Sequence, residues 1–507
     1  MKLFTIGDSI SQGFMSGAAA RTDLCYSTLV AQNMGLKNYN YPNWPREGIP
    51  YNIETIFRRL ERRLGSDVSG PIEWARAASI LNSYFDEIED FYERGEGRMK
   101  GHYNEQPFHN VAVRGFDAAY SWLITSALCE EVVSKDPGSN DDWWGKVNQP
   151  LLRTSHRVLH PNNGELPLNQ NSQIDWLHYH HQKEGVENIV LWLGANNALG
   201  TVVDLEIKQT SEDGSLFSHI TPDQIDYKTR VKKGWNLWHP LDFEKEYAFM
   251  LDKVITTLED NPHRVDYKVF VATVPMVTIA PITKSAGNIR SEIMVKEWPV
   301  DKTNPAPMGV NALKGHIDQT YSYGTHYPYF LFADTFKITD KHLNQAEIVH
   351  IDNVIRRYNR IIQEQVAKAN ERIKSPRFYL VDIGMALSEM AIKRNFAQPT
   401  YNFPDYFEYI HPKVDVRYYG TDQQGNMKSG GLFSLDGVHP TAIGQGLIAW
   451  EFLKVMEQAG VKGANPNTLP WKEIFESDTL RKNPLKITHE IYDNIQLKRF
   501  LLDKIIG

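Results

Sequence analysis

Five short apolar runs, separated by stretches with helical periodicity, constrain the fold of this chain more than any other feature of its sequence. The runs are rich in β-branched and aromatic residues and are bounded by Gly, Asp or Pro, as in strands buried on both faces. Because they alternate with helices, they predict a three-layer α/β/α fold around a mostly parallel sheet of about five strands. The runs are Leu3–Ile6, Val111–Val113, Asn188–Leu193, Lys268–Val274 and Phe378–Ile383.

Two later segments show the clearest helical periodicity. Phe243–Asp260 places Tyr247, Met250 and Val254 on one face, and Ile351–Asn370 repeats the same spacing. Apolar residues three and four positions apart form a stripe that a helix turns toward a core. Both segments therefore predict helices that cover the sheet.

Long connections between the runs predict insertions. The segments near 37–108 and 281–349 hold about 70 residues each, which is more than a compact connection needs. A third, polar insertion is expected near 201–242. We therefore expect one domain over residues 1–460 with these three insertions, followed by a helical tail over 461–507.

The insertions differ in composition. The first is expected to contain helices at Ile53–Leu64 and Pro71–Arg94. The last carries many aromatic residues between 321 and 330, which suit the packing of a lid over a site more than a sugar-binding platform. Insertions of this kind act as caps that shape the pocket of the enclosing domain.

Composition narrows the functional classes. The chain has 507 residues, 41% hydrophobic and 23% charged, which is typical of a globular protein. A net charge of -7 argues against a nucleic-acid partner. No apolar stretch is long enough for an integral membrane segment, and the first residues lack the apolar region of a secretion signal. We expect a cytoplasmic protein.

Two short segments at opposite ends of the sequence contain candidate catalytic residues. Ser9 follows the first apolar run, and Asp436 and His439 stand three residues apart just before Pro440, which we expect to begin a helix. A serine hydroxyl becomes a nucleophile when a base is within hydrogen-bond reach and a carboxylate orients that base. Taken singly, the serine could equally be a helix N-cap and the Asp-His pair a surface turn.

Two glycine-containing strand ends add to these two segments. Gly115 follows the second run, and Gly194 and Asn196 follow the third. The carboxyl ends of parallel strands are where an open α/β sheet places its ligand crevice. Each of these segments alone is more often a plain turn.

In chain order, the four blocks Gly7-Asp8-Ser9, Gly115, Gly194-x-Asn196 and Asp436-x-x-His439 resemble those of the SGNH hydrolases, also called the GDSL esterase/lipase family. The resemblance implies a flavodoxin-like core with a catalytic triad. Ser9 would be the nucleophile, His439 the general base and acid, and Asp436 the orienting carboxylate. The oxyanion hole would consist of the Ser9 and Gly115 backbone N–H groups and the Asn196 side chain.

Two residues depart from the usual family pattern. Ile10 stands where the first block commonly has Leu, which is a conservative change. Asn197 stands where the third block usually has Asp. The second departure puts in doubt how the loop around Asn196 is supported.

Other catalytic signals are weak. The chain lacks the G-x-S-x-G motif of the lipase-type α/β-hydrolases. His178, His180 and His181 could bind a metal, but we interpret them as a solvated run before a strand. No metal or organic cofactor is expected.

The sequence therefore predicts a carboxylic ester hydrolase that works through an acyl-enzyme. Its substrate would be a small-molecule, carbohydrate or lipid ester, and its acyl and alcohol specificity and its oligomeric state stay open. Two alternatives also stay open. One is an acyltransferase or O-deacetylase that acts on carbohydrate with the same site, and the other is a noncatalytic binding protein with the same fold.

Overall fold

The fold is described by a computed structural model. It covers residues 1–18, 21–66, 68, 70–98, 107–135, 147–160, 168–286, 293–294, 320–321, 325–328, 341–391, 393, 399–416, 419–421 and 427–488.

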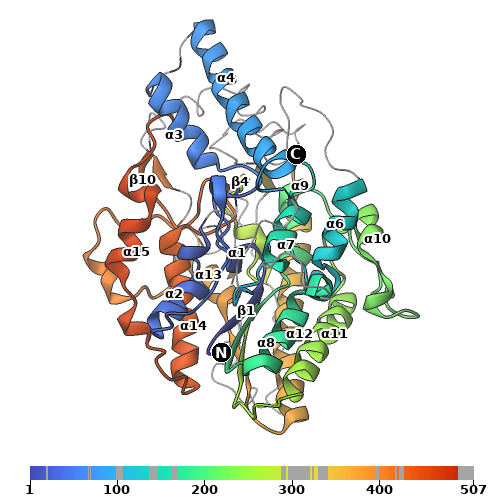
Figure 1. Ribbon diagram of the computed structural model, residues 1–507. Helices are drawn as coiled ribbons and strands as arrows, with labels where there is room; N and C mark the ends of the chain where they lie inside the picture. Colours follow the sequence, from blue (N-terminus) through green and yellow to red (C-terminus); the bar gives the residue numbers. More distant parts are fainter. Residues whose placement is uncertain are drawn as a thin grey trace.

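A parallel sheet of four strands forms the centre of the molecule (Figure 1). The strands lie in the order β1 (Phe4–Gly7), β2 (Asn188–Trp192), β3 (Lys268–Ala272) and β8 (Phe378–Val381). Every residue of β1 and β2 is buried, as the uninterrupted apolar runs predict. The predicted α/β class and four of the five expected strands are therefore confirmed.

The fifth run, Val111–Val113, is not a regular strand, so the sheet has four regular strands where about five were expected. The run does lie beside β1: Thr5 N donates to His109 O, Val111 N to Thr5 O and Val113 N to Gly7 O, over 2.8–3.1 Å. The carbonyl of Val111 instead accepts a hydrogen bond of 2.6 Å from the side chain of Gln173. That side chain also donates to Gly7 O at 2.9 Å and interrupts the ladder.

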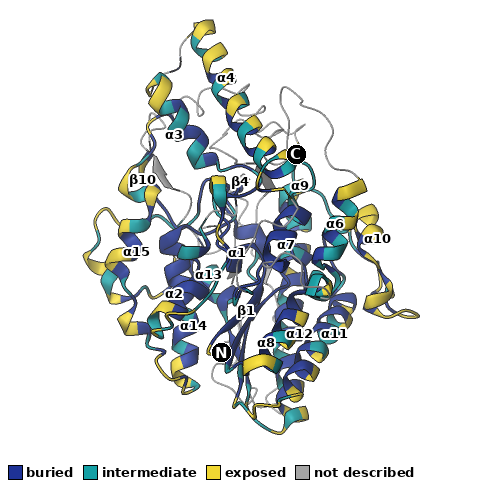
Figure 2. Ribbon diagram, viewed as in Figure 1, coloured by how far each residue is buried: buried dark blue, intermediate teal, exposed yellow. Residues whose placement is uncertain are grey.

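Two hydrophobic cores lie on opposite faces of the sheet. Alternate residues of each strand belong to different cores, since successive side chains of a strand point to opposite faces. Ile189 and Leu191 enter one core, whereas Val190 and Trp192 enter the other. The strands are buried while the outer helix faces are exposed (Figure 2).

Helices cover both faces of the sheet, so that the architecture has three layers (Figure 1). The first core is closed by α8 (Gln173–Glu184), α11 (Pro240–Glu259) and α12 (Gln345–Ile373). The second is closed by α2 (Tyr26–Asn33), α13 (Ile383–Met390) and α14 (Ala442–Gln458). The helices predicted around Phe243–Asp260 and Ile351–Asn370 are thus confirmed as α11 and α12.

The first insertion is helical, as expected. It contains α3 (Ile53–Leu64), which matches the predicted bounds, and α4 (Gly70–Glu89), which continues as a π-helical turn to Arg94. These helices project from the end of the molecule (Figure 1). Their apolar faces form a third, smaller core with Leu480, Leu485 and Ile487 from the tail.

The other insertions contain short elements. Residues 201–242 include α10 (Tyr227–Lys233), and α9 (Gly200–Asp204) precedes it. In the last insertion, β4 (Thr283–Ala286) pairs with β7 (Thr325–Pro328), and β5 (Ile293–Met294) pairs with β6 (Thr320–Tyr321). The expected aromatic lid at 321–330 lies largely outside the described residues, and its side chains are not described.

The remaining elements flank the core. The described part of the tail ends at residue 488 and includes two short helices, α15 (Trp471–Ser477) and α16 (Thr479–Lys482). Helix α15 packs against α14, and α16 packs against β10 (Met427–Gly430). None of the described helices is long and apolar enough to cross a membrane. These elements are α1 (Ser9–Gln12), α5 (Tyr120–Leu123), α6 (Ser126–Lys135), α7 (Pro150–Leu159), β9 (Tyr419–Thr421), β10 (Met427–Gly430), α15 (Trp471–Ser477) and α16 (Thr479–Lys482).

The side chain of Gln173 holds the edge of the sheet, and this gives a stability prediction. Replacement by Ala removes the donor for two buried carbonyls, so Gln173→Ala should lower the free energy of unfolding by about 2–4 kcal/mol. Urea denaturation measures this change. Gln182→Ala is the matched control, because Gln182 lies on the same helix and donates at its exposed end to Asp260 O at 2.9 Å. Equal stability of the two variants would contradict the proposed role of Gln173.

Candidate active site

Ser9 lies at the carboxyl end of β1, where the strand passes directly into α1. Asp8 is the N-cap of this short helix, and its carboxylate accepts a hydrogen bond of 3.0 Å from Ile10 N. Ser9 is the first helical residue, so its own N–H has no acceptor within the helix. In the described part of the chain that N–H donates to no other group.

The loop before α14 presents Asp436 and His439. Ser434 N donates to His439 O over 2.8 Å, which closes the loop into a tight turn. The helix begins at Ala442 with Thr441 as its N-cap, two residues later than the start expected at Pro440. Thr441 caps the helix because its side chain accepts a hydrogen bond from Gly444 N, which a proline cannot provide.

Ser9, His439 and Asp436 form a continuous hydrogen-bonded chain. The Nε2 atom of His439 lies 2.8 Å from Ser9 Oγ, and its Nδ1 atom lies 2.9 Å from Asp436 Oδ2. All three residues are buried, with 5–9% of their surfaces exposed. The structure thus brings together the three residues that the sequence analysis selected, in the arrangement that nucleophile, base and orienting carboxylate require.

Four hydrogen bonds fix the carboxylate of Asp436. Its Oδ2 atom also accepts from Gly17 N, and its Oδ1 atom accepts from the backbone N–H groups of Val438 and His439, each at 2.9 Å. Burial by itself raises the pKa of Asp436. The charge and hydrogen bond of His439 and the two Oδ1 donors outweigh burial, and the pKa is lowered. Asp436 therefore stays ionised at neutral pH.

Phe14 and Arg114 complete the surroundings of the imidazole. The rings of Phe14 and His439 lie 4.7 Å apart between centroids, inclined at 60°. The guanidinium carbon of Arg114 lies 5.1 Å from the centre of the Phe14 ring. Burial lowers the pKa of Arg114 to about 10, which leaves a half-buried positive charge next to Gly115.

Asn196 contacts the chain neighbours of Ser9 and Gly115, the other two residues of the expected oxyanion hole. Gly115 has a φ of +74°, which favours glycine, and in the described residues its N–H donates to no other group. Asn196 lies in a 3-10 turn after β2, and Gly194 begins this turn with a φ of +118°. The Asn196 amide donates to Phe116 O at 2.9 Å and lies 3.4 Å from Asp8 Oδ2. These contacts place Asn196 between the neighbours of Gly115 and Ser9.

The contact with Asp8 is long, so this N–H of Asn196 is free to move to a closer acceptor. Burial raises the pKa of Asp8 to about 7, although the Ile10 N–H and the charge of His439 act in the opposite direction. Near neutral pH, Asp8 therefore carries only part of a negative charge. A reduced charge here would limit repulsion of any negative charge placed next to Ser9.

A buried polar network supports the Asn196 loop, and the sequence analysis missed it. The Asn197 side chain accepts a hydrogen bond of 3.2 Å from Ala118 N and donates one of 3.0 Å to Glu246. Glu246 in turn pairs with Arg230 at 2.9 Å, and Arg230 lies 3.9 Å from Asp117. A glutamate at position 246 falls on the apolar stripe of the helix predicted at Phe243–Asp260, and this signal could have revealed a buried ion pair.

This network explains the departure at position 197. Burial and then the charge of Glu246 raise the pKa of Asp117 to about 7, while Arg230 lowers it. Two carboxylates thus already share one guanidinium. An amide at position 197 supplies a hydrogen-bond donor to Glu246, whereas a third carboxylate there would repel the Glu246 carboxylate.

The histidine run differs from the sequence interpretation. The three histidines precede strand β2, as expected, but they lie within helix α8, and His178 is exposed whereas His180 and His181 are buried. The periodicity of α8 turns these two rings inward, against Phe108 O and Val186 N.

Comparisons with known proteins give no family for the chain. No protein-family model matches it, and no curated protein matches its sequence. The function must therefore be inferred from the residues and their geometry.

The charge balance around position 197 can be tested by placing a carboxylate there. Asn197→Asp should lower the free energy of unfolding by about 2–4 kcal/mol, because it places a carboxylate against buried Glu246. Chemical denaturation measures the loss. The double variant Asn197→Asp/Glu246→Gln returns a hydrogen-bond donor to this contact and should recover part of the lost stability. A single variant as stable as the parent, or a double variant no better than the single one, would refute this explanation.

Proposed function

We propose that this protein is a serine ester hydrolase of the SGNH type. The observation that carries the proposal is the hydrogen-bonded chain from Ser9 Oγ through His439 to Asp436, over 2.8 and 2.9 Å. Buried, aligned nucleophile, base and carboxylate are the parts of an acyl-transfer site.

The strand arrangement supports the same proposal. With the segment Asn110–Val113 counted beside β1, the parallel segments lie in the chain order second, first, third, fourth and fifth. This is the flavodoxin-like order, in which the crevice opens at the carboxyl ends of the strands. Ser9, Gly115 and Asn196 all follow such ends, as the SGNH resemblance requires.

Acylation would start with attack by Ser9. His439 Nε2 accepts the proton of the serine hydroxyl as Oγ bonds to the ester carbonyl carbon, and Asp436 holds the resulting imidazolium. Collapse of the tetrahedral intermediate transfers this proton to the leaving alcohol. Water then attacks the acyl-enzyme by the same relay and releases the acid.

The negative oxygen of each intermediate would be stabilised by three donors. The N–H groups of Ser9 and Gly115 are already free in the described structure, and Asn196 contributes its weakly held N–H. Donors that are placed before the reaction cost no reorganisation when the charge develops. The substrate would be a small-molecule, carbohydrate or lipid ester.

Removal of the nucleophile tests the proposal. Ser9→Ala should abolish turnover in a screen of short aryl esters and acetylated sugars, because among the described residues Ser9 supplies the hydroxyl that hydrogen-bonds to the imidazole of His439. Ser11→Ala is the matched control: Ser11 lies on the same helix, but its hydroxyl contacts Tyr26 Oη at 2.8 Å. Activity should persist in this control. Unchanged turnover in Ser9→Ala would overturn the proposal, and products formed with an added alcohol would identify a transferase.

The oxyanion hole gives an independent prediction. Asn196→Ala should lower kcat by about 10²–10³, because one donor to the developing charge is lost. Steady-state kinetics on the best ester found in the screen would measure this effect. A raised KM with an unchanged kcat would show that Asn196 binds the ground state and the transition state equally well, and would contradict its proposed role.

A further inference from the structure

The described residues contain two clusters that each combine two histidines with one glutamate. The first is His109, His180 and Glu184, and the second is Glu130, His156 and His160. Within each cluster the ligand atoms lie within 4.8 Å of one another. Two imidazoles and one carboxylate are a common donor set for Zn²⁺. The two clusters differ in what already surrounds these atoms.

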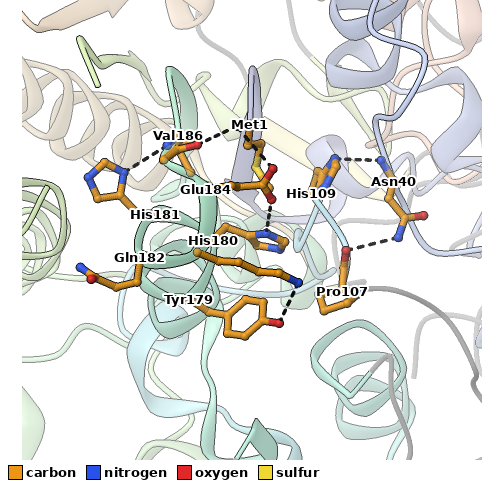
Figure 3. A network of polar contacts seen from close by, with 12 residues as sticks. Met1, Asn40, Pro107, His109, Tyr179, His180, His181, Gln182, Glu184 and Val186 are labelled. Carbon is orange, nitrogen blue, oxygen red and sulfur yellow. Dashed lines mark hydrogen bonds and ion pairs between the residues drawn. The ribbon is translucent and has the colours of Figure 1, made fainter. Parts of the chain in front are cut away.

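The first cluster is occupied by protein groups (Figure 3). Asn40 N donates to His109 Nδ1 at 3.1 Å, so the proton of the neutral ring must lie on Nε2, where a metal would otherwise bind. The Glu184 carboxylate lies 3.4 Å from His180 Nδ1, and Phe108 O lies 3.2 Å from His180 Nε2. Both nitrogens of the His180 ring therefore already lie against protein oxygens.

The second cluster is open to a metal. We propose that Glu130, His156 and His160 form a Zn²⁺ site that links helices α6 and α7. His156 and His160 are four residues apart, so their rings lie one above the other at the end of α7, stacked at 5.0 Å between centroids. Glu130 reaches them from α6, with Oε1 2.9 Å from His156 Nε2.

Hydrogen bonds with neighbouring groups fix the tautomer of the His160 ring that can bind a metal. Ser126 Oγ donates its proton to Asn169 O at 2.9 Å. The same hydroxyl oxygen, 3.4 Å from His160 Nδ1, therefore accepts the Nδ1–H of the ring. This leaves the lone pair of Nε2 free, and such an outer hydrogen bond is typical of histidines that bind metals.

The two histidines of the site are buried, whereas the glutamate is partly exposed to solvent. His156 and His160 are 1% and 8% exposed, whereas the side chain of Glu130 is 43% exposed. A metal ion can approach past the glutamate and replace the proton that His156 and Glu130 share. Three protein ligands leave a fourth, tetrahedral position for water.

The position of the site suggests a supporting role. Helix α7 also carries Leu151, whose Cδ1 atom lies 3.4 Å from the position that a Cβ atom would take at residue 115. Zn²⁺ between α6 and α7 would fix the helix that packs behind this glycine. The site is separate from the proposed triad, and it stands whether or not the protein hydrolyses esters.

The two clusters serve as each other's control in a binding experiment. Full-length protein is stripped with EDTA and titrated with ZnCl₂ against a chromophoric chelator. The parent should bind one equivalent, and His160→Gln and Glu130→Gln should each weaken binding at least about tenfold. His180→Gln and Glu184→Gln, from the first cluster, should bind as the parent does. Absence of saturable binding, or equal weakening by both pairs of variants, would overturn the proposal.

Thermal unfolding separates lost binding from lost folding. Zn²⁺ should raise the Tm of the parent by mass action and raise that of Glu130→Gln by less. In EDTA the two proteins should unfold at the same temperature, since the half-exposed Glu130 side chain contributes little without metal. A Zn²⁺-induced rise of the same size in both proteins would contradict the assigned ligands.

Discussion

The buried carboxylate of Asp436 is the constraint on which the site depends. A buried charge is tolerated only when hydrogen bonds replace its lost hydration. Asp436 obtains them from both ends of the chain: Gly17 N follows the first strand, and Val438, His439 and the imidazole belong to the loop before α14. The interaction that orients His439 therefore also fixes this loop against the segment after Ser9, although Ser9 and His439 are 430 positions apart.

A second buried charge system supports the loop that carries Asn196. Arg230, Glu246 and Asp117 lie beneath the loop of Asn196, and Asn197 joins them to that loop as a neutral donor. The two systems differ in kind. Asp436 is stabilised by backbone N–H groups and one imidazole, whereas the carboxylates near Asn197 depend on a shared guanidinium. This difference explains why an amide, and not a carboxylate, is suited to position 197.

The sequence was sufficient to predict those features that depend on a short stretch of residues. Leu3–Ile6 and Asn188–Leu193 are uninterrupted apolar runs, and both form strands. Ser9, Asp436 and His439 were selected from short motifs, and the structure places them in contact. The sequence was insufficient where a side chain distant in the chain determines the local structure. Val111–Val113 fails to complete a strand because Gln173 takes one of its carbonyls, and the pairing of Glu246 with Arg230 depends on how two separate helices pack.

Covalent labelling of Ser9 tests the central claim most directly. A fluorophosphonate loses fluoride when a serine oxygen activated by a neighbouring base attacks phosphorus, and mass spectrometry of the digested protein locates the adduct. We expect one adduct, on Ser9, that forms rapidly in the parent protein and at a greatly reduced rate in His439→Gln. Labelling that avoids Ser9, or that proceeds equally fast without the imidazole, would contradict a catalytic triad.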